Sequence, residues 1–184
     1  TFEYPEYHMD MVRVGVVLYG VAPSGKVRGC DELAPVMSLK SVISMIKEID
    51  CGDTVSYGCT YTADKKTKIA TVPVGYADGF WRSNAENGTQ VLVRGQRVNI
   101  VGRVCMDQLM LDVTDVKGVR EGDYITVIGV DKNDRITAED LAKKNGTIGY
   151  EMICSIGERV PRFYIKDHEI VFVKDNIVSY EMSE

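Results

Sequence analysis

The chain has 184 residues, of which 45 % are apolar, and its 22 Lys and Arg against 27 Asp and Glu give a formal charge of −5. This charge argues against nucleic acid or an anionic membrane surface as a partner, because both bind basic proteins. The apolar content excludes intrinsic disorder, and no apolar run approaches the roughly 18 residues of a membrane-spanning helix. The polar, acidic start has no signal-peptide layout. We therefore predict a compact, soluble protein of the cytoplasm, without membrane contact.

Cysteine usage agrees with a reducing compartment. The cysteines are Cys30, Cys51, Cys59, Cys105 and Cys154, an odd number without a C-x-x-C pair, and two histidines accompany them. This spacing does not match a zinc site. We expect five free thiols and no bound metal.

The first predicted element is a strand over Val12–Tyr19, an apolar run that only Arg13 and Gly15 interrupt. Such a run is typical of a strand buried on both faces of a parallel sheet. Turn residues follow it, which predicts a domain boundary at about residues 25–33. Since the rest of the sequence supplies no parallel neighbours, this strand resembles the last strand of an α/β domain.

Beyond this boundary the pattern is mainly β. Alternating apolar residues predict one long strand over Val36–Ile49, and turn signals such as Asn87-Gly88 separate the shorter strands that follow. These are predicted over Thr54–Tyr61, Thr67–Val74, Gln90–Val93, Val98–Val104, Met110–Val113, Tyr124–Ile128 and, near the end, 162–165 and 169–173. Regular short strands of this kind indicate a closed or sandwich-like β domain.

Two helices are predicted within this β domain. Thr137 and Asp140 form a capping-box pattern at the start of the first, and Asn145-Gly146 ends it. The second is shorter and lies around Ile148–Met152.

The opening apolar run holds a charged residue that needs a partner. The Arg13 guanidinium is costly to bury unless it meets an anion, a ring nitrogen or a carboxylate. Gly15, two residues later, allows a phosphate to approach the backbone. The simpler alternative is an arginine that extends to water from a strand end, with Gly15 at a bulge.

Two tyrosines, Tyr57 and Tyr76, each stand next to a glycine near a predicted strand end. A phenol in such a place can project into a cleft and act as a base, provided that a neighbouring cation lowers its pKa from about 10. The ordinary alternative is a strand residue in one case and a turn residue in the other.

A third segment contains Arg103, Cys105 and Asp107. Cys105 is a poor candidate for a nucleophile, because His8 and His168 lie near the ends of the chain and not in a suggestive relation to it. Arg103 and Asp107 could form a charged network beside a ligand, or a surface ion pair that contributes little to stability.

Taken together, these segments resemble one family. Arg-Val-Gly-Val-Val-Leu-Tyr-Gly, Val-Ser-Tyr-Gly-Cys-Thr-Tyr-Thr, Pro-Val-Gly-Tyr-Ala-Asp-Gly, Val-Gly-Arg-Val-Cys-Met-Asp-Gln, Ile-Gly-Tyr-Glu and Arg-Val-Pro-Arg occur in this order. The residues of these motifs and their order resemble the C-terminal portion of the bacterial alanine racemases, pyridoxal-phosphate-dependent enzymes of fold type III. The resemblance extends from about residue 11 to about residue 173.

The resemblance implies a division of the chain into two parts. Residues 1–25 would be the end of a (β/α)8 barrel that carries the cofactor, including its last strand. Residues 30–184 would be the mainly β, β-barrel-like C-terminal domain. The barrel lysine that forms a Schiff base with pyridoxal phosphate has no match in this sequence, so this chain alone is expected to be inactive.

The resemblance also implies cofactor-binding roles. Arg13 matches the arginine that hydrogen-bonds the pyridine nitrogen, and Gly15 and Val16 match positions whose backbone amides contact the cofactor phosphate. Tyr150 matches a tyrosine whose hydroxyl reaches that phosphate. Gly149 departs from the family pattern, in which an Asn precedes this tyrosine.

Catalytic and substrate-binding roles follow in the same way. Tyr57 matches the tyrosine that removes or returns the substrate's α-proton on one face, while the barrel lysine serves the other. Met106 matches the residue whose backbone amide binds the substrate carboxylate, with Cys105 and Asp107 on either side of it.

A homodimer is a further implication. Tyr76 matches a tyrosine at the mouth of the active site, and Arg103 a residue of a charged network behind it. In this family Tyr57, Tyr76 and Met106 act on the cofactor of the other subunit.

The expected activity is interconversion of L-alanine and D-alanine, which supplies D-alanine for peptidoglycan. One alternative is a serine racemase of the same family, with or without a membrane anchor in its full length. Tyr150 favours alanine over serine, because it keeps a bulky residue beside the pocket. Another alternative is a structural or dimerisation module without catalysis.

Overall fold

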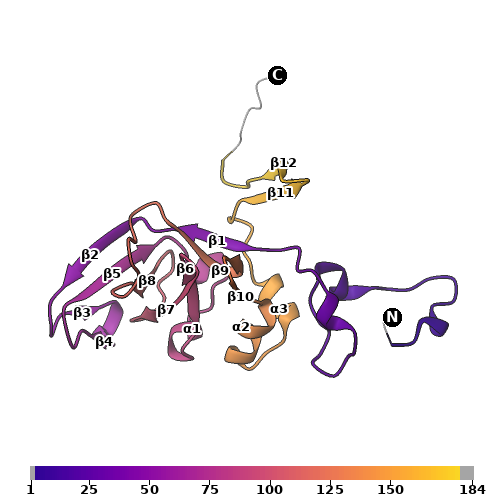
Figure 1. The fold of residues 1–184 in the computed structure, drawn as a ribbon, viewed down its shortest axis with the longest axis horizontal. Coiled ribbons are helices and arrows are strands. Elements are labelled where there is room, and N and C mark those ends of the chain that lie inside the picture. Colours follow the sequence, from indigo (N-terminus) through magenta and orange to yellow (C-terminus); the bar gives the residue numbers. More distant parts are fainter. Residues whose placement is uncertain (1–2, 179–184) are drawn as a thin grey trace, which may run out of the picture.

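The computed structural model describes residues 3–178 and places most strands in one antiparallel sheet (Figure 1). The strand order is β1-β9-β6-β7-β8-β5-β2, and β10 pairs with β9 outside this path. The strands of this sheet are β1 (Leu39–Val42), β2 (Met45–Ile49), β5 (Thr67–Val72), β6 (Gln90–Val93), β7 (Gln96–Val101), β8 (Leu109–Asp112), β9 (Tyr124–Asp131) and β10 (Asp134–Ile136). Two separate hairpins consist of β3 (Thr54–Val55) with β4 (Tyr61–Thr62), and of β11 (Arg162–Lys166) with β12 (Glu169–Lys174).

The helices are short. They are α1 (Ser83–Glu86), α2 (Ala138–Asn145), α3 (Gly149–Cys154) and the 3-10 helices η1 (Pro5–Tyr7), η2 (Gly15–Tyr19), η3 (Cys30–Glu32), η4 (Tyr57–Cys59) and η5 (Tyr76–Asp78). Among residues 3–178, none of them combines the length and the apolar character needed to cross a membrane.

The sheet closes on itself at the corner between β1 and β2. These strands stand at the two ends of the strand order, yet only Ile43 and Ser44 separate them in sequence. The Ile43 N–H donates to the Asp123 carbonyl and the Ser44 N–H to the Thr71 carbonyl, each at 2.9 Å. The sheet therefore curls until its ends meet, which agrees with the predicted β-barrel-like domain. The single strand predicted over Val36–Ile49 is wrong, because at this corner the chain changes its partner from β9 to β5.

The other strands of the barrel lie close to their predicted positions. β5, β6, β7, β8 and β9 overlap the five predicted strands from Thr67 to Ile128, and β11 and β12 overlap the two late ones. The sequence pattern missed β10 and α1, which have three and four residues, because elements this short show no periodicity.

The main core is made by strands of the sheet together with α2 and α3. It contains aliphatic side chains with no exposed surface, among them Val72, Val91, Leu92, Val93, Leu109, Leu111, Ile125 and Val127. Successive residues of β8 point to opposite faces. Thus Leu109 and Leu111 belong to the main core, whereas Met110 packs in a second cluster with Ile69 and Cys105. This second cluster links the Cys105 loop directly to the barrel wall.

The helix α2 begins at the predicted capping box. The Thr137 hydroxyl accepts the Asp140 N–H at 3.1 Å, and the Asp140 carboxylate accepts the Thr137 N–H at 2.9 Å. Two N–H groups that the helix itself cannot pair are satisfied in this way. α2 ends at Gly146 as predicted, and α3 overlaps the helix predicted around Ile148–Met152.

The strand predicted over Val12–Tyr19 is wrong. Residues 15–19 form the 3-10 helix η2, bounded by Gly15 at φ 67° and Gly20 at φ 71°, both outside the β region. Within the described part of the chain no strand lies alongside this segment to pair its backbone groups, and an unpaired strand is not stable alone. Of the residues in η2 only Val16 is buried.

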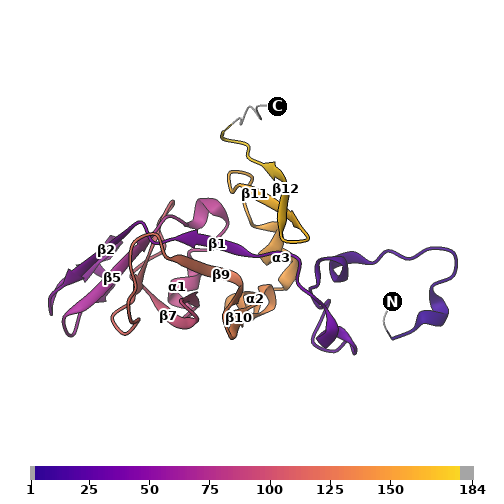
Figure 2. The same ribbon diagram turned by 45° about the horizontal axis from the view of Figure 1, so that its top comes forward.

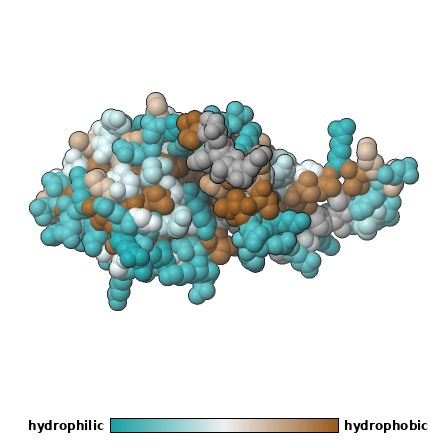
Figure 3. All heavy atoms as spheres, turned by 90° about the horizontal axis from the view of Figure 1, so that it is seen from above, coloured by the Kyte–Doolittle hydropathy of each residue, from teal (hydrophilic) through white to brown (hydrophobic). Residues whose placement is uncertain are grey.

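The hairpin of β11 and β12 stands away from the barrel (Figures 1 and 2). Its apolar side chains are exposed on both faces, with Phe163 at 56 % and Phe172 at 59 %. Figure 3 shows hydrophobic surface where this hairpin rises between the barrel and the N-terminal segment. The two late strands therefore form as predicted but do not pack against the domain core.

Candidate functional site

Tyr57 lies in η4, a turn between β3 and β4. The strand predicted over Thr54–Tyr61 is wrong here, because Ser56 and Gly58 have φ of 70° and 73°, outside the β region. The kink shortens β3 and β4 to two residues each and leaves the Tyr57 side chain 73 % exposed. The predicted catalytic phenol is thus presented outward on a tight turn.

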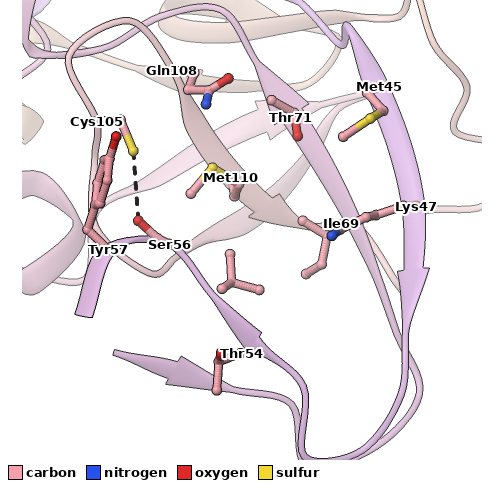
Figure 4. A pocket seen from close by; sticks show the side chains of 11 residues that line it. Met45, Lys47, Thr54, Ser56, Tyr57, Ile69, Thr71, Cys105, Gln108 and Met110 are labelled. Atoms are coloured by element: carbon pink, nitrogen blue, oxygen red, sulfur yellow. Dashed lines mark hydrogen bonds between the residues drawn. The ribbon is translucent and has the colours of Figure 1, made fainter. Parts of the chain in front are cut away.

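The loop between β7 and β8 supports this turn. The Ser56 hydroxyl donates to the Arg103 carbonyl at 2.8 Å, and its oxygen lies 3.8 Å from the Cys105 sulfur (Figure 4). Gly102 has φ of 70°, and a Cβ there would stand only 2.5 Å from the Ser56 Cβ. A glycine is therefore required for this close approach. The Tyr57 turn and the Cys105 loop form one packed unit.

Arg103 extends from this loop toward the Tyr57 turn. One of its terminal nitrogens lies 3.3 Å from where a Cβ on Gly58 would stand, so the glycine leaves room for the guanidinium. The Arg103 Nε is buried and has no hydrogen-bond partner in the described structure. A buried N–H without a partner is costly, which is typical of a site that another group completes. Arg103 also lines a pocket of about 310 Å³ with Glu86 and Tyr61.

Tyr76 and Met106 are brought together by backbone hydrogen bonds. The Tyr76 N–H donates to the Cys105 carbonyl and the Ala77 N–H to the Met106 carbonyl, each at 3.0 Å. This contact is possible because Gly75 has no side chain: a Cβ there would lie 2.3 Å from the Met106 oxygen. The side chains of Tyr76 and Met106 remain 43 % and 53 % exposed. Both predicted substrate-contacting residues therefore lie on adjoining, accessible loops.

Arg159 bridges these two loops, and the sequence reasoning gave it no role. Its Nε donates to Asp78 and one terminal N–H donates to Asp107, both at 2.7 Å. These contacts, chiefly the hydrogen bond with Asp78, raise the pKa of the Arg159 guanidinium above its already high value. The hydrogen-bond partner of Asp107 is thus Arg159, rather than the Arg103 suggested by the sequence. Arg159 is the first residue of the Arg-Val-Pro-Arg motif, and this motif was the sequence feature that could have identified it.

A pocket of about 330 Å³ lies beside Tyr57 on the face of β2, β5 and β8. Figure 4 shows the labelled side chains around it, including Lys47, Thr71 and Gln108. Cys105 lines it as well, but its thiol is mostly buried and faces Ser56 and the Arg103 carbonyl. Its recorded partners are therefore a hydroxyl and a carbonyl and not a histidine, the residue that would activate a cysteine nucleophile.

The segment around η2 docks on α2 and α3. The Ala22 N–H donates to the Glu139 carboxylate at 2.9 Å, and Val16 and Val21 are part of the main core. A Cβ on Gly149 would lie 2.9 Å from a methyl carbon of Val21. The departure from the expected Asn at position 149 therefore has a physical reason, since the close packing against Val21 leaves no room for a side chain.

Three of the four predicted cofactor residues lie in η2 and α3, the two elements that this docking joins. Gly15 and Val16 begin η2, and Tyr150, 38 % exposed, stands in the first turn of α3. Arg13 precedes η2 and is exposed. A Cβ on Gly15 would meet nothing within 4 Å, so the space beside Gly15 is open.

The two groups of predicted residues lie in different parts of the molecule. In Figure 1 the hairpin of β3 and β4, whose turn holds Tyr57, is at one end of the barrel, and the N-terminal segment, drawn in indigo, lies beyond α3 at the other. The structure brings together Tyr57, Tyr76, Arg103, Cys105, Met106 and Asp107. It does not bring them to Arg13, Gly15 and Val16.

Comparisons with known proteins show the family of this chain. Residues 36–164 match the family model of the alanine racemase C-terminal domain. The chain is 49 % identical over 168 residues to alanine racemase 2 of Caldanaerobacter subterraneus subsp. tengcongensis, covering 91 % of this chain and 43 % of that protein.

Two solved structures are similar to this chain. One is the alanine racemase of Clostridium difficile 630, with a TM-score of 0.85 and 42 % identity, covering 91 % of this chain and 43 % of that one. The other is the alanine racemase of Bacillus anthracis with bound L-Ala-P, with a TM-score of 0.82 and 40 % identity, covering 88 % and 41 %. The chain spans less than half the length of the relatives it matches.

Proposed function

Because the chain belongs to the alanine racemase family, we propose that it takes part in the interconversion of L-alanine and D-alanine. The observation that carries this proposal is the cluster of three accessible residues, Tyr57, Tyr76 and Met106, on adjoining loops that backbone hydrogen bonds and a serine hydroxyl hold together. A similar structure that holds L-Ala-P supports alanine as the substrate class.

Inversion of an α-carbon needs proton-transferring groups on opposite faces of the substrate. We assign Tyr57 to one face, where its phenol removes or returns the α-proton. A lysine from a preceding barrel would serve the other face. The Met106 backbone amide would donate to the substrate carboxylate, and Tyr76 would line the entrance. Arg103, with its unpaired Nε, would join a charged network behind them.

The residues around η2 fit pyridoxal phosphate. Gly15 and Val16 begin a helix whose first amides have no partner within that helix, and the space beside Gly15 is open. Tyr150 would add its hydroxyl from α3, and Arg13 would donate to the ring nitrogen. A guanidinium does not readily give up a proton, so Arg13 keeps that nitrogen unprotonated. When bound, the cofactor would supply an electron sink that makes the substrate's α-proton more acidic.

We further propose that residues 1–25 belong to the end of a (β/α)8 barrel and residues 30–184 to the C-terminal β domain. The hairpin of β3 and β4, which holds Tyr57, and the N-terminal segment, which holds η2, lie at opposite ends of the barrel in Figure 1. One active site would therefore combine Arg13 and Tyr150 of one subunit with Tyr57, Tyr76 and Met106 of another. This arrangement is a homodimer with residues contributed across the interface.

The test is Tyr57→Phe in a complete enzyme carrying this domain, with α-proton exchange from each alanine enantiomer followed by NMR in heavy water. The change keeps the ring and removes only the group that carries the proton. We expect exchange from L-alanine to fall by about 10²–10⁴-fold, the usual contribution of a general base. Exchange from D-alanine, which uses the opposite face, should persist.

Tyr124→Phe is the matched control, because Tyr124 is similarly exposed, at 69 %, but lies on β9 away from the site. Equal losses for both enantiomers, or none for L-alanine, would remove Tyr57 from this role. A parent enzyme that exchanges the α-proton of serine but not of alanine would refute the substrate assignment.

A further inference from the structure

We propose that Arg159 is a positioning residue of this site, which holds the Tyr76 loop and the Met106 loop in the relative arrangement that the substrate carboxylate requires. The inference rests on the proposed function, because Tyr76 and Met106 matter for the substrate only if that proposal holds. Arg159 itself would not touch the substrate.

The geometry shows one side chain with a separate bond to each loop. Its Nε reaches Asp78, at the end of η5, and a terminal N–H reaches Asp107, which directly follows Met106. Both distances are 2.7 Å. A guanidinium presents its donors in a fixed plane, so the two carboxylates are held at a fixed spacing.

Asp78 passes this restraint on to the start of the Tyr76 loop. One of its carboxylate oxygens accepts from Arg159, and the other accepts from the Gly75 N–H at 2.7 Å. Gly75 in turn stands against the carbonyls of Cys105 and Met106. The carboxylate is 15 % exposed, so water competes little for these bonds.

Arg159 is itself anchored by the segment that follows α3. The Gly157 N–H donates to the Asp78 carbonyl at 3.0 Å, and the Ser155 hydroxyl donates to the Gly79 carbonyl at 3.1 Å. The chain after α3 therefore runs along η5 and delivers the guanidinium from a fixed backbone. Because Tyr150 is in the first turn of the same helix, one short segment connects the two groups of predicted site residues.

Stability alone does not account for the bond between Arg159 and Asp107. Asp107 is 63 % exposed and Arg159 is 37 % exposed, and ion pairs in contact with solvent contribute little to the free energy of folding. Without the pair, the Asp107 side chain would be free to rotate in water. The effect of the pair is thus on the position of the loops, and a variant should lose substrate affinity more than stability.

The test compares Arg159→Gln and Arg159→Lys with the parent in a complete enzyme carrying this domain. Arg162→Gln is the matched control, an exposed arginine three residues later that donates to the Ile156 carbonyl. We expect Arg159→Gln to raise KM for alanine by about tenfold with kcat within about threefold, because uniform binding is lost while the Tyr57 turn is retained. Arg159→Lys should restore KM only in part, since one ammonium cannot reproduce the fixed spacing of the two guanidinium donors that reach Asp78 and Asp107.

Amide hydrogen exchange supplies a readout that does not depend on activity. The N–H groups of Tyr76 and Ala77 donate across the two loops, so they should exchange faster in Arg159→Gln than in the parent or in Arg162→Gln. Asp107→Asn should change KM in the same direction, and combining it with Arg159→Gln should add little, because both remove the same bond.

Each outcome decides between the two proposals. If the parent does not racemise alanine but Arg159→Gln still speeds amide exchange at Tyr76 and Ala77, the proposed function is refuted and the positioning role of Arg159 stands. An active parent in which Arg159→Gln leaves KM unchanged would overturn the positioning role. So would a fall in the unfolding midpoint without a change in KM, or a KM increase that Arg162→Gln shares.

Discussion

Replacing Gly75 by alanine tests the contact between the Tyr76 loop and the Met106 loop directly. A Cβ at this position would lie 2.3 Å from the Met106 oxygen and 2.4 Å from the Cys105 oxygen. Both obstacles are backbone atoms, so no side-chain rotation relieves the overlap. The loops must separate, and the hydrogen bonds from Tyr76 and Ala77, each 3.0 Å long, must lengthen or break.

The expected loss of stability follows from these bonds. Each hydrogen bond contributes about 1 kcal/mol net, so that losing two costs roughly 2 kcal/mol. Phe80, which follows this loop and is 2 % exposed, would lose part of its packing as the loop moves. We expect a total of about 2–3 kcal/mol, equivalent to a melting temperature lower by roughly 5–10 °C for a chain of this size.

Urea and thermal unfolding of the chain, followed by circular dichroism, measure this loss. Gly25→Ala is the matched control, because a Cβ there meets nothing within 4 Å. Its free energy of unfolding should stay within about 0.5 kcal/mol of the parent value. If Gly75→Ala and Gly25→Ala unfold at the same urea concentration as the parent, the contact between the loops does not exist as described.

Two further predictions concern α2 and the Arg97–Asp134 pair. Thr137→Ala removes the acceptor of the Asp140 N–H and should lower the free energy of unfolding in urea by about 1 kcal/mol, whereas Thr137→Ser should retain most of it. The hydrogen bond from Arg97 is the main cause that lowers the pKa of Asp134 below 3.8. A carboxylate with a lowered pKa stabilises the fold fully above its unfolded value and loses this effect as the pH falls through the folded value. The melting temperature of the parent should therefore fall below about pH 4, and the melting temperature of Asp134→Asn should fall less over the same pH range. Equal decreases in the two proteins would show that the Arg97–Asp134 pair does not form in solution.

Local signals were enough to predict some elements of the fold. The helix α2 has its capping box and its terminal Gly146 within the segment itself, and β6 is bounded by turn residues on both sides. The break at Ile43 was not predictable in this way. It exists because the closing sheet offers the chain one partner before the corner and another after it, and the alternation of apolar residues continues through both.

The apolar run over Val12–Tyr19 shows a different limit. Hydrophobicity indicates that a segment will be buried, but not which neighbour will bury it. Here η2 packs on α2 and α3 through Val16, while its other side chains stay accessible. The physical signal against a strand was present in Gly15 and Gly20, which flank the turn and adopt left-handed conformations.

In the candidate site, the motifs predicted which residues lie close together but not which contacts position them. The partners of Arg159 lie 81 and 52 residues away in sequence. No local spacing can indicate such a pair. The motif Pro-Val-Gly-Tyr-Ala-Asp-Gly nevertheless contained both Gly75 and Asp78, and these two residues set the loop on which Tyr76 stands.

The construction of these loops has a consequence for which residues determine the geometry. Tyr57, Tyr76 and Met106 expose their side chains, while the bonds that place them run through backbone atoms and through Ser56 and Arg159. An exposed side chain can be exchanged at little cost in stability, whereas a Cβ at Gly75 or Gly102 would collide with a neighbouring loop. The two glycines and Arg159, through its bonds to Asp78 and Asp107, therefore fix the shape of the site. The exposed side chains are left free to make contacts outside this chain.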